Sequence, residues 1–237
     1  MSQIQILQCP GRAFFVGDLH GEFAKLQIAL KQCQFDPLQG DQLFCVGDLI
    51  DRGPDSLGCL SLVSQPWFHA IQGNHERMML DAIEGDAEQQ ALWHDAGGDW
   101  YQSLTPELQD HAANLALHWL HPMPLILEVE LPQLNARIGL IHADCPGNDW
   151  RALAAQAHAG LDRRDTAICQ WSRDTLNHMS QGKYPAPIQG IDAVVFGHTP
   201  QSMIRSHGNR VWLDTGAGYQ RGHLSLLSAE QVLEILR

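Results

Sequence analysis

The amino-acid sequence predicts an α/β fold in which two β-sheets pack face to face and helices cover the outer sides. Over the first 85 residues, short apolar runs alternate with segments of helical periodicity. That alternation is typical of a sheet whose strands are joined by crossover helices. Further apolar runs follow in the second half of the chain, and they supply enough strands for a second sheet.

The first half is expected to read β-α-β-α-β-α. Residues 13–16, 42–46 and 67–71 are apolar runs of strand length. Residues 22–34 repeat apolar side chains at helical spacing, and Asp55 is a candidate N-cap for the helix after the second strand. Residues 77–83 open a third helix.

The second half begins with a segment, 85–124, that is helical and turn-rich and reads as a helical insertion. Residues 125–130 and 137–141 then predict a hairpin, and 152–170 a helical connection. The remaining expected strands, with a turn at 228–231, are 193–196, 210–213, 223–227 and 232–236. We expect residues 1–237 to form a single domain.

Composition narrows the function. The formal net charge is −12, so neither nucleic acid nor an anionic membrane is an expected partner. No apolar run approaches the roughly 20 residues of a membrane span, and the N-terminus has no secretory signal pattern. The six cysteines form no C-x-x-C pair, which favours free thiols in a reducing cytoplasm.

Three early segments share one design, in which an apolar strand is followed by glycine and then by polar side chains. The segments are GDLHG at 17–21, GDLIDRG at 47–53 and GNHE at 73–76. Asp18 and Asp48 are 30 residues apart, and Asp48 and His75 are 27 apart, about one strand–helix unit each time. The carboxyl ends of such strands converge on one crevice, where ligands bind.

Two later segments repeat the design, because His142 and His198 also follow apolar runs. A lone aspartate at a strand end is usually a cap or turn residue. Five ligand-type strand ends in one chain are better explained by a shared site. Carboxylate, amide and imidazole ligands suit manganese, iron or zinc, and two ions would fit a two-metal hydrolytic site.

These motifs, in this order and spacing, resemble the PPP family of metallophosphatases, and with IHAD at 141–144 and FGHT at 196–199 its bacterial and phage-lambda-type branch. The resemblance implies a calcineurin-like αββα sandwich with the dinuclear metal site at strand C-terminal ends. It also implies protein phosphatase activity and two divalent ions, with Mn²⁺ expected and Fe or Zn as alternatives.

The resemblance also implies residue roles. Asp18, His20 and Asp48 would hold one metal, and Asp48, Asn74, His142 and His198 the other. His75 would be the general acid and Asp51 its carboxylate partner. Arg52, Arg173 and Asn74 would contact the phosphate, although Arg163 and Arg164 lie near Arg173 and compete for that role.

The expected chemistry is direct attack on phosphorus by a water deprotonated between the two ions. His75 would protonate the leaving oxygen, and Asp51 would favour the charged imidazolium. Other roles remain open: Asp51 could cap or pair with Arg52, Arg52 could be a structural ion pair, and His75 could be a metal ligand. Glu76 is expected to anchor an arginine or a backbone turn.

The expected substrates are phosphorylated serine or threonine side chains of proteins. The first alternative is a symmetrical dinucleoside tetraphosphate hydrolase. Such enzymes resemble this chain but typically lack an acid at the place of Asp51 and have Asp at the place of Glu76. The second is an inactive, metal-stabilised binding module. Four tryptophans are expected to be packing residues, namely Trp93, Trp100, Trp119 and Trp171. Asp144 lies near His142 in the sequence and could touch the metal site or its waters.

Overall fold

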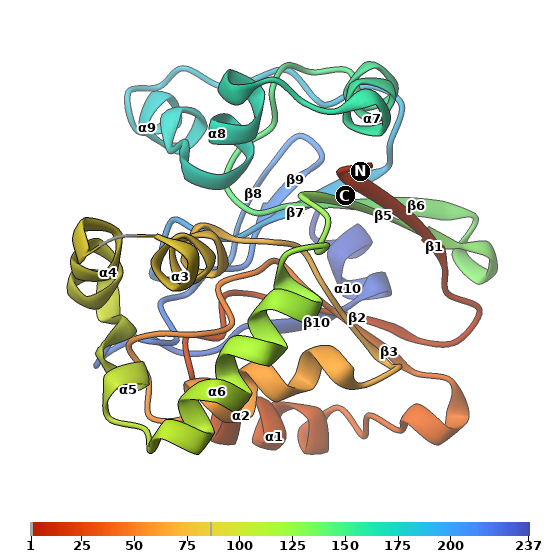
Figure 1. The fold of residues 1–237 in the computed structure, drawn as a ribbon. Coiled ribbons are helices and arrows are strands. Elements are labelled where there is room, and N and C mark those ends of the chain that lie inside the picture. The colour runs from red at the N-terminus through yellow and green to blue at the C-terminus, as the bar shows by residue number, and fades with distance from the viewer. Residues whose placement is uncertain (1, 86) are drawn as a thin grey trace.

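The structure is a computed structural model that describes residues 2–85 and 87–237, and it contains two β-sheets between layers of helices (Figure 1). The six-stranded sheet has the order β1-β5-β6-β7-β9-β8 and the four-stranded sheet the order β10-β2-β3-β4. The strands of the two sheets, in chain order, are β1 (Ile4–Gln8), β2 (Ala13–Val16), β3 (Gln42–Cys45), β4 (Phe68–Ala70), β5 (Ile126–Leu131), β6 (Ala136–Ile141), β7 (Ala193–Phe196), β8 (Arg205–His207), β9 (Arg210–Trp212) and β10 (Leu226–Ser228). The predicted sandwich of two mixed sheets is confirmed.

The helices cover the two outer faces of this sandwich. In Figure 1, α1, α2 and α6 lie beyond the four-stranded sheet, and α7, α8 and α9 beyond the six-stranded sheet. The α-helices are α1 (Phe23–Gln32), α2 (Ser56–Ser61), α3 (Asn74–Glu84), α4 (Ala87–Trp93), α5 (Asp99–Gln102), α6 (Pro106–Leu115), α7 (Trp150–Ala159), α8 (Arg163–Trp171), α9 (Asp174–Ser180) and α10 (Ala229–Glu234). Shorter helical turns are η1 (Pro37–Gln39), η2 (Leu62–Ser64), η3 (His94–Gly98), η4 (Ala116–Leu120) and η5 (Pro132–Leu134).

Alternating side chains of the strands divide the interior into layers. In β2, Ala13 and Phe15 face the core between the two sheets, whereas Phe14 and Val16 face the core under α1 and α2. A third core lies between the six-stranded sheet and the α7–α9 layer, around Trp150. Because β2 is buried on both faces, its sequence is a continuous apolar run rather than an alternating one.

The predicted parallel strands of the first half are present, since β2 pairs with β3 and β3 with β4 in parallel. The predicted hairpin is the antiparallel pair β5 and β6. Asp55 caps α2 by accepting the Gly58 N–H at 2.8 Å, as expected. Parallel pairing places the ends of β2, β3 and β4 along one edge, and this edge carries the first three motifs.

The prediction of a strand at 232–236 is wrong, because the chain forms the helix α10 over Ala229–Glu234. Ser228 accepts the Gln231 N–H at 3.3 Å, and the Gln231 side chain accepts the Ser228 N–H at 2.8 Å. This capping box starts a helix where the sequence analysis expected a turn. Val232 of α10 packs into the core between the sheets, so burial and not strand pairing explains its apolar character.

The segment expected to be a helical insertion contains α4, η3, α5, α6 and η4, with no strand among its described residues. Trp93, Ala112, Ala116 and Leu120 join the core cluster that includes the outer face of the four-stranded sheet. The segment is therefore packed into the body of the protein and is not a loose surface excursion.

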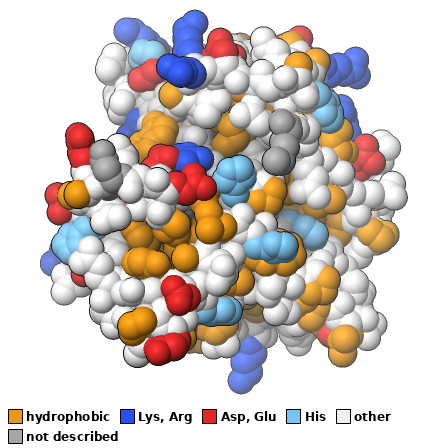
Figure 2. All heavy atoms as spheres, viewed as in Figure 1, with side chains coloured by type: hydrophobic (Ala, Val, Ile, Leu, Met, Phe, Trp, Pro, Cys, Tyr) orange, Lys and Arg blue, Asp and Glu red, His pale blue; other side chains and the backbone are white. Residues whose placement is uncertain are grey.

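The helices, the surface charges and the cysteines bear on what the composition predicted. No helix in the described ranges has the length and apolar character needed to span a bilayer. Basic side chains, drawn in blue, gather at the top of Figure 2, where the α7–α9 layer lies. Arg151 in α7 and Arg163 and Arg164 in α8 are exposed. All six cysteines are free, and only Cys33 is not fully buried.

Candidate metal centre and active site

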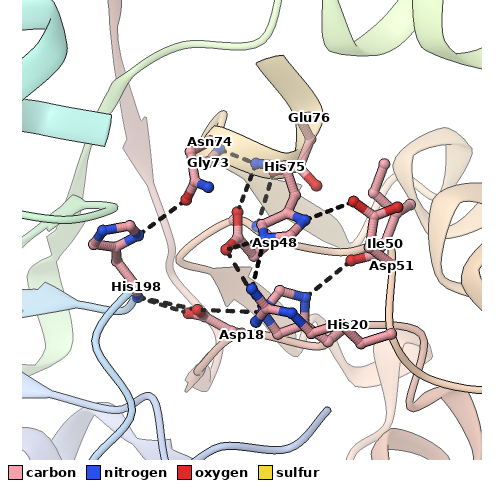
Figure 3. Close-up of polar contacts among 12 residues, drawn as sticks. Asp18, His20, Asp48, Ile50, Asp51, Gly73, Asn74, His75, Glu76 and His198 are labelled. Carbon is pink, nitrogen blue, oxygen red and sulfur yellow. Dashed lines mark hydrogen bonds and ion pairs between the residues drawn. The ribbon is translucent and has the colours of Figure 1, made fainter. Parts of the chain in front are cut away.

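Strand ends of both sheets bring the expected ligand residues to one place (Figure 3). Asp18 and His20 follow β2, Asp48 follows β3, and Asn74 begins α3 after β4. From the other sheet, His142 follows β6 and His198 follows β7. All six side chains are buried, with at most 6 % of any residue exposed. The convergence of these residues is what the spacing predicted.

Two groups of side chains within this cluster could each hold a metal ion. In each group one ligand atom per residue lies within 4.8 Å of the others, and the groups are His20, Asp48 and His75, and Asp48, His142 and His198. Asp48 belongs to both groups, which is the arrangement a bridging carboxylate would have. Asp18 lies beside the first group, with Oδ2 4.0 Å from His20 Nε2.

The histidines are oriented as metal ligands usually are. His20 Nδ1 lies 3.0 Å from the Ile50 carbonyl oxygen and His142 Nδ1 2.7 Å from that of Val46. A ring N–H donated to these carbonyls leaves the Nε2 lone pair facing the centre. His142 Nε2 and His198 Nδ1 lie 3.0 and 2.9 Å from Asn74 Oδ1. Several electron-pair donors thus face one point, which fits a cation there.

The charges of the cluster also call for a cation. Burial, and then Asp214 and Asp48, raise the pKa of Asp18 well above its usual value. The pKa of Asp48 lies well below its usual value, because His142 and His75 outweigh the opposing effect of burial. Neighbouring buried carboxylates repel each other, and a divalent ion relieves that repulsion. The donor set therefore fits a dinuclear divalent centre.

Two of the imidazoles remain neutral over the physiological range. Burial lowers the pKa of His20 to about 3, and it lowers that of His198 to about 3 with a further contribution from His142. At His142 burial lowers the pKa, but Asp48 outweighs it and raises the pKa above the ordinary value. A metal ion at His142 would displace that proton.

Tight backbone turns aim these side chains. Among the described residues other than glycine, positive φ angles occur at His20 (43°), Asp48 (50°), Asp51 (76°), Arg52 (69°) and His198 (65°), and elsewhere only at Gln34 and Asn135. Such conformations cost about 1–3 kcal/mol each and persist only where the surroundings hold them. Their concentration at one place marks this edge of the sandwich as the functional site.

Glu76 holds one of these turns from inside. Its carboxylate accepts the backbone N–H of Asp48 at 2.8 Å, of Leu49 at 2.7 Å and of Gly73 at 2.9 Å. It therefore anchors backbone, one of the two roles expected for it. Gly73 allows Asp48 to approach, because a Cβ atom at residue 73 would lie 2.2 Å from Asp48 Oδ1.

His75 and Asp51 form a direct pair. His75 Nδ1 lies 2.6 Å from Asp51 Oδ2, and both residues are buried. Burial lowers the pKa of His75, but Asp48 and Asp51 together outweigh it and raise the pKa above its ordinary value. The other ring nitrogen, Nε2, lies 3.9 Å from Asp48 Oδ2 and faces the cluster of candidate metal ligands. The ring is therefore held so that Nε2 meets whatever binds the centre.

Two arginines reach the same centre. Arg52 Nη1 lies 2.5 Å from His20 Nε2 and Nη2 lies 2.9 Å from His75 Nε2, while the guanidinium lies over the Tyr219 ring. Arg173 Nε lies 3.2 Å from His198 Nε2. Arg163 and Arg164 are exposed at the start of α8, and the structure gives neither of them a contact with the cluster.

Asp144 supports Arg173. Its carboxylate accepts the Thr175 hydroxyl at 2.8 Å and the Thr175 N–H at 3.0 Å, and the Ser172 hydroxyl lies 3.4 Å away. These contacts fix the start of α9, where Arg173 is the N-cap residue. Asp144 therefore orients the segment that carries Arg173.

The sequence analysis missed three residues near the site. Asp214 is buried just after β9, and its pKa is raised by burial and then by Asp48. An aspartate that follows the apolar run 211–213 is the same signal that identified the other strand ends. Trp93 and Trp100 were expected to be packing residues, but both donate indole N–H groups to Asp51. Nothing in their spacing could have shown this.

With this fold and cluster in place, the chain belongs to the calcineurin-like phosphoesterase family, whose family model matches residues 11–202. It is 41% identical over 213 residues to serine/threonine-protein phosphatase 1 of Salmonella typhimurium, which covers 89% of this chain and 88% of the relative. It is 37% identical over 203 residues to serine/threonine-protein phosphatase 2 of Escherichia coli, at 85% and 86% coverage.

Other relatives carry a different name. A symmetrical bis(5'-nucleosyl)-tetraphosphatase of Shewanella oneidensis is 34% identical over 172 residues, or 68% of this chain and 57% of that protein. A solved protein provisionally described as a diadenosine tetraphosphatase superposes with a TM-score of 0.64, at 22% identity and 97% and 94% coverage. This structural likeness supports the fold, and the chain is a phosphoesterase by family.

Proposed function

We propose that this protein is a metal-dependent phosphatase that hydrolyses phosphoserine and phosphothreonine in proteins. One observation carries the proposal: the buried His75–Asp51 pair faces the metal cluster, with His75 Nδ1 2.6 Å from Asp51. A serine or threonine alkoxide is a poor leaving group and needs a proton as the ester bond breaks. Relatives named serine/threonine-protein phosphatases, which align over 85% and 89% of this chain, support the same assignment.

We assign the metal ligands as the motif resemblance implies. Asp18, His20 and Asp48 would hold one divalent ion, and His75 lies beside His20 and Asp48. Asp48, Asn74, His142 and His198 would hold the other, and Mn²⁺ is the expected metal, with Fe or Zn as alternatives. When bound, two such ions neutralise phosphate charge and lower the pKa of a bound water.

The protein's own residues then bind and orient the ester. Arg52 and Arg173 donate to the non-bridging phosphate oxygens, for which a planar guanidinium is well shaped. The amide of Asn74 lies at the same centre and serves as a further phosphate contact. Arg52 is exposed and lies on a turn, so its guanidinium can move from the two imidazoles to an incoming phosphate.

His75 acts as the general acid. Its Nδ1–H stays hydrogen-bonded to Asp51, and its Nε2 proton passes to the leaving oxygen as the phosphorus–oxygen bond breaks. Asp51 favours the charged imidazolium by proximity and fixes the ring.

The expected partners are phosphorylated proteins or peptides. Because all six cysteines are free thiols, we place the enzyme in a reducing compartment, the cytoplasm.

A substrate comparison tests the proposal. The purified protein with Mn²⁺ should release phosphate from phosphoserine and phosphothreonine peptides faster than it cleaves diadenosine tetraphosphate at equal concentration. Phosphotyrosine and phosphohistidine peptides belong in the panel to define the preference. Chelator should abolish the activity, and added Mn²⁺ should restore it.

The alternatives give other results. Faster cleavage of diadenosine tetraphosphate would assign the enzyme to the nucleotide branch, which the Shewanella oneidensis relative represents. No hydrolysis of any phosphate ester in the presence of bound metal would favour an inactive binding module. Unchanged turnover after complete metal removal would overturn the metal assignment.

A further inference from the structure

The carboxylate of Asp51 receives two indole N–H groups from the helical segment that the sequence marked as an insertion. Trp100 Nε1 donates to Oδ1 at 2.7 Å, and Trp93 Nε1 lies 3.0 Å from Oδ2 and 3.1 Å from Oδ1. Trp93 ends α4 and Trp100 lies in α5, so both come from outside the three strand-end motifs. His75 provides the remaining donor, at 2.6 Å from Oδ2.

These donors leave the carboxylate fully paired. Asp51 is 0% exposed, so no solvent reaches it. A buried carboxylate is stable only where each oxygen accepts hydrogen bonds. Here Oδ1 faces both tryptophans, and Oδ2 faces Trp93 and His75. Removing one indole N–H would free the carboxylate to rotate, and the His75 ring would turn with it.

The tryptophans are themselves held firmly. Their ring centroids are 6.1 Å apart at an interplanar angle of 90°, and Tyr101 packs against Trp93 at 5.4 Å and Trp100 at 6.0 Å. The Trp93–Trp100 and Trp100–Tyr101 contacts are edge-to-face, and such packing fixes ring orientation and so the direction of each N–H. The aromatic group, Trp93, Trp100 and Tyr101, forms a rigid support behind the acid pair.

The same segment also holds the neighbouring arginine. The Gly97 carbonyl accepts the Arg52 backbone N–H at 3.2 Å, and Gly97 has φ of 113°. Asp51 and Arg52 are consecutive residues with positive φ, a conformation that requires external support. The η3 turn and the two indoles provide it on one side, and the Ser56 hydroxyl, which accepts the Asp51 N–H at 2.8 Å, provides it on the other.

We propose that Trp93 and Trp100 are positioning residues that orient Asp51 and thereby aim His75 Nε2 at the leaving oxygen. The helical segment from α4 to α5 is therefore part of the proton-donating machinery. This inference rests on the proposed phosphatase function. It predicts that loss of an indole N–H impairs reactions that need proton donation and spares those that do not.

Trp100→Phe, and separately Trp93→Phe, removes the N–H and keeps most of the aromatic packing. Turnover of a phosphoserine peptide should fall by about 10-fold to 100-fold, as for other residues that orient a catalytic group. Turnover of p-nitrophenyl phosphate, whose leaving group needs no proton, should fall less than about 3-fold. Trp119→Phe is the matched control, because Trp119 follows α6 in η4, contacts His118 and is not among the donors to Asp51.

A double-mutant comparison shows whether the tryptophan acts through Asp51. In the Asp51→Asn background, adding Trp100→Phe should change phosphoserine turnover by less than about 2-fold, because the coupled group is already lost. Equal losses on both substrates in the single variants, or full additivity in the double variant, would overturn the inference.

An NMR measurement gives a readout that does not depend on activity. Of the seven tryptophans, the indole N–H resonances of Trp93 and Trp100 should shift and exchange faster with solvent in Asp51→Asn. Those of Trp119 and Trp171 should not move. Unmoved Trp93 and Trp100 resonances would overturn the inference even if the protein proved to be an inactive module. Absent hydrolysis with shifted resonances would instead overturn the proposed function alone.

Discussion

The two sheets contribute to the site in different ways. The four-stranded side delivers Asp18, His20, Asp48, Asn74 and His75 from 58 consecutive residues, on turns that other buried groups hold. The six-stranded side delivers His142 and His198, which lie 56 residues apart, from strand ends supported by backbone carbonyls. In the proposed mechanism, the first side would set the direction of proton transfer, and the second would complete the set of metal ligands and add Arg173.

The comparison shows that the residues of one site can be held in place by different kinds of support on its two sides. Around Asp51 and Asp48, the supporting groups are the buried Trp93 indole, the partly buried Trp100 indole and the buried Glu76 carboxylate. Around Arg173, the support is one carboxylate, Asp144, acting on an exposed residue. Changes on the first side should alter the chemical step, and changes on the second should alter binding.

The largest effect is expected where the two sides meet. Asp48→Asn removes a negative ligand that belongs to both metal groups, so metal-dependent hydrolysis should fall by roughly 10⁴-fold or more. Metal analysis of the purified variant should show fewer ions per chain than in the wild type. Asp110→Asn, an exposed residue of α6, is the control, and full metal occupancy in Asp48→Asn would disprove the bridging role.

A change on the four-stranded side should act on chemistry alone. His75→Asn is expected to lower turnover of phosphoserine peptides by roughly 10²–10⁴-fold, because the leaving alkoxide loses its proton donor. The loss on p-nitrophenyl phosphate should be smaller. Parallel steady-state assays on the two substrates decide the matter. A loss of the same size on both would assign His75 to the metal, the alternative that its place in a ligand group allows.

A change on the six-stranded side should act on binding. Asp144→Asn weakens the contacts that hold Ser172 and Thr175, so kcat/KM should fall roughly 10-fold, mainly through a higher KM. Asp149→Asn is a matched control, since Asp149 caps α7 in the same helical layer and holds no arginine. Urea unfolding should show a loss of about 1 kcal/mol for Asp144→Asn, which weakens charged hydrogen bonds, and almost none for Asp149→Asn, because asparagine caps a helix about as well as aspartate. A fall in kcat with constant KM would contradict the expectation that the six-stranded side acts on binding and the four-stranded side on chemistry.

The smallest effect concerns stability and not catalysis. His69 in β4 is partly buried, and burial lowers its pKa, so the folded state keeps it neutral where the unfolded chain binds a proton. The contribution of this ring to stability is complete above pH 6.5 and is lost as pH falls below that value.

His69→Gln should therefore flatten the pH dependence of the free energy of unfolding between pH 7.5 and 5, compared with wild type. The difference between the two urea-unfolding curves is the measurement, and His111→Gln is the control. An unchanged slope in His69→Gln would show that burial of this ring does not affect proton binding. Activity at pH 7.5 should remain at the wild-type level in both variants.

The sequence predicted which side chains converge at one place, because each lies at a fixed place relative to an apolar strand. Strand ends meet by geometry, so spacing alone placed Asp18, Asp48 and His198 together. It predicted α10 wrongly because Val232, Leu233 and Leu236 are apolar in either secondary structure, and the capping box from Ser228 to Gln231 was read as a turn.

The tryptophan contacts lay beyond such reasoning. Trp100 reaches Asp51 across 49 residues through the packing of α4, η3 and α5, and no local pattern encodes that contact. A buried indole is most often a packing residue, and its hydrogen-bond partner depends on the tertiary structure. Asp214, in contrast, carried a visible signal and could have been found with the other strand ends.

The burial of the thiols has a consequence for how this chemistry tolerates oxidants. Burial raises the pKa of Cys9 to about 11 and of Cys145 to about 12, and it raises the pKa of the partly exposed Cys33 as well. Peroxide attacks thiolates, so these side chains are poor targets at neutral pH. The proposed hydrolysis relies on carboxylates and imidazoles and on no cysteine, so oxidation of a thiol would not remove a residue that the chemistry needs.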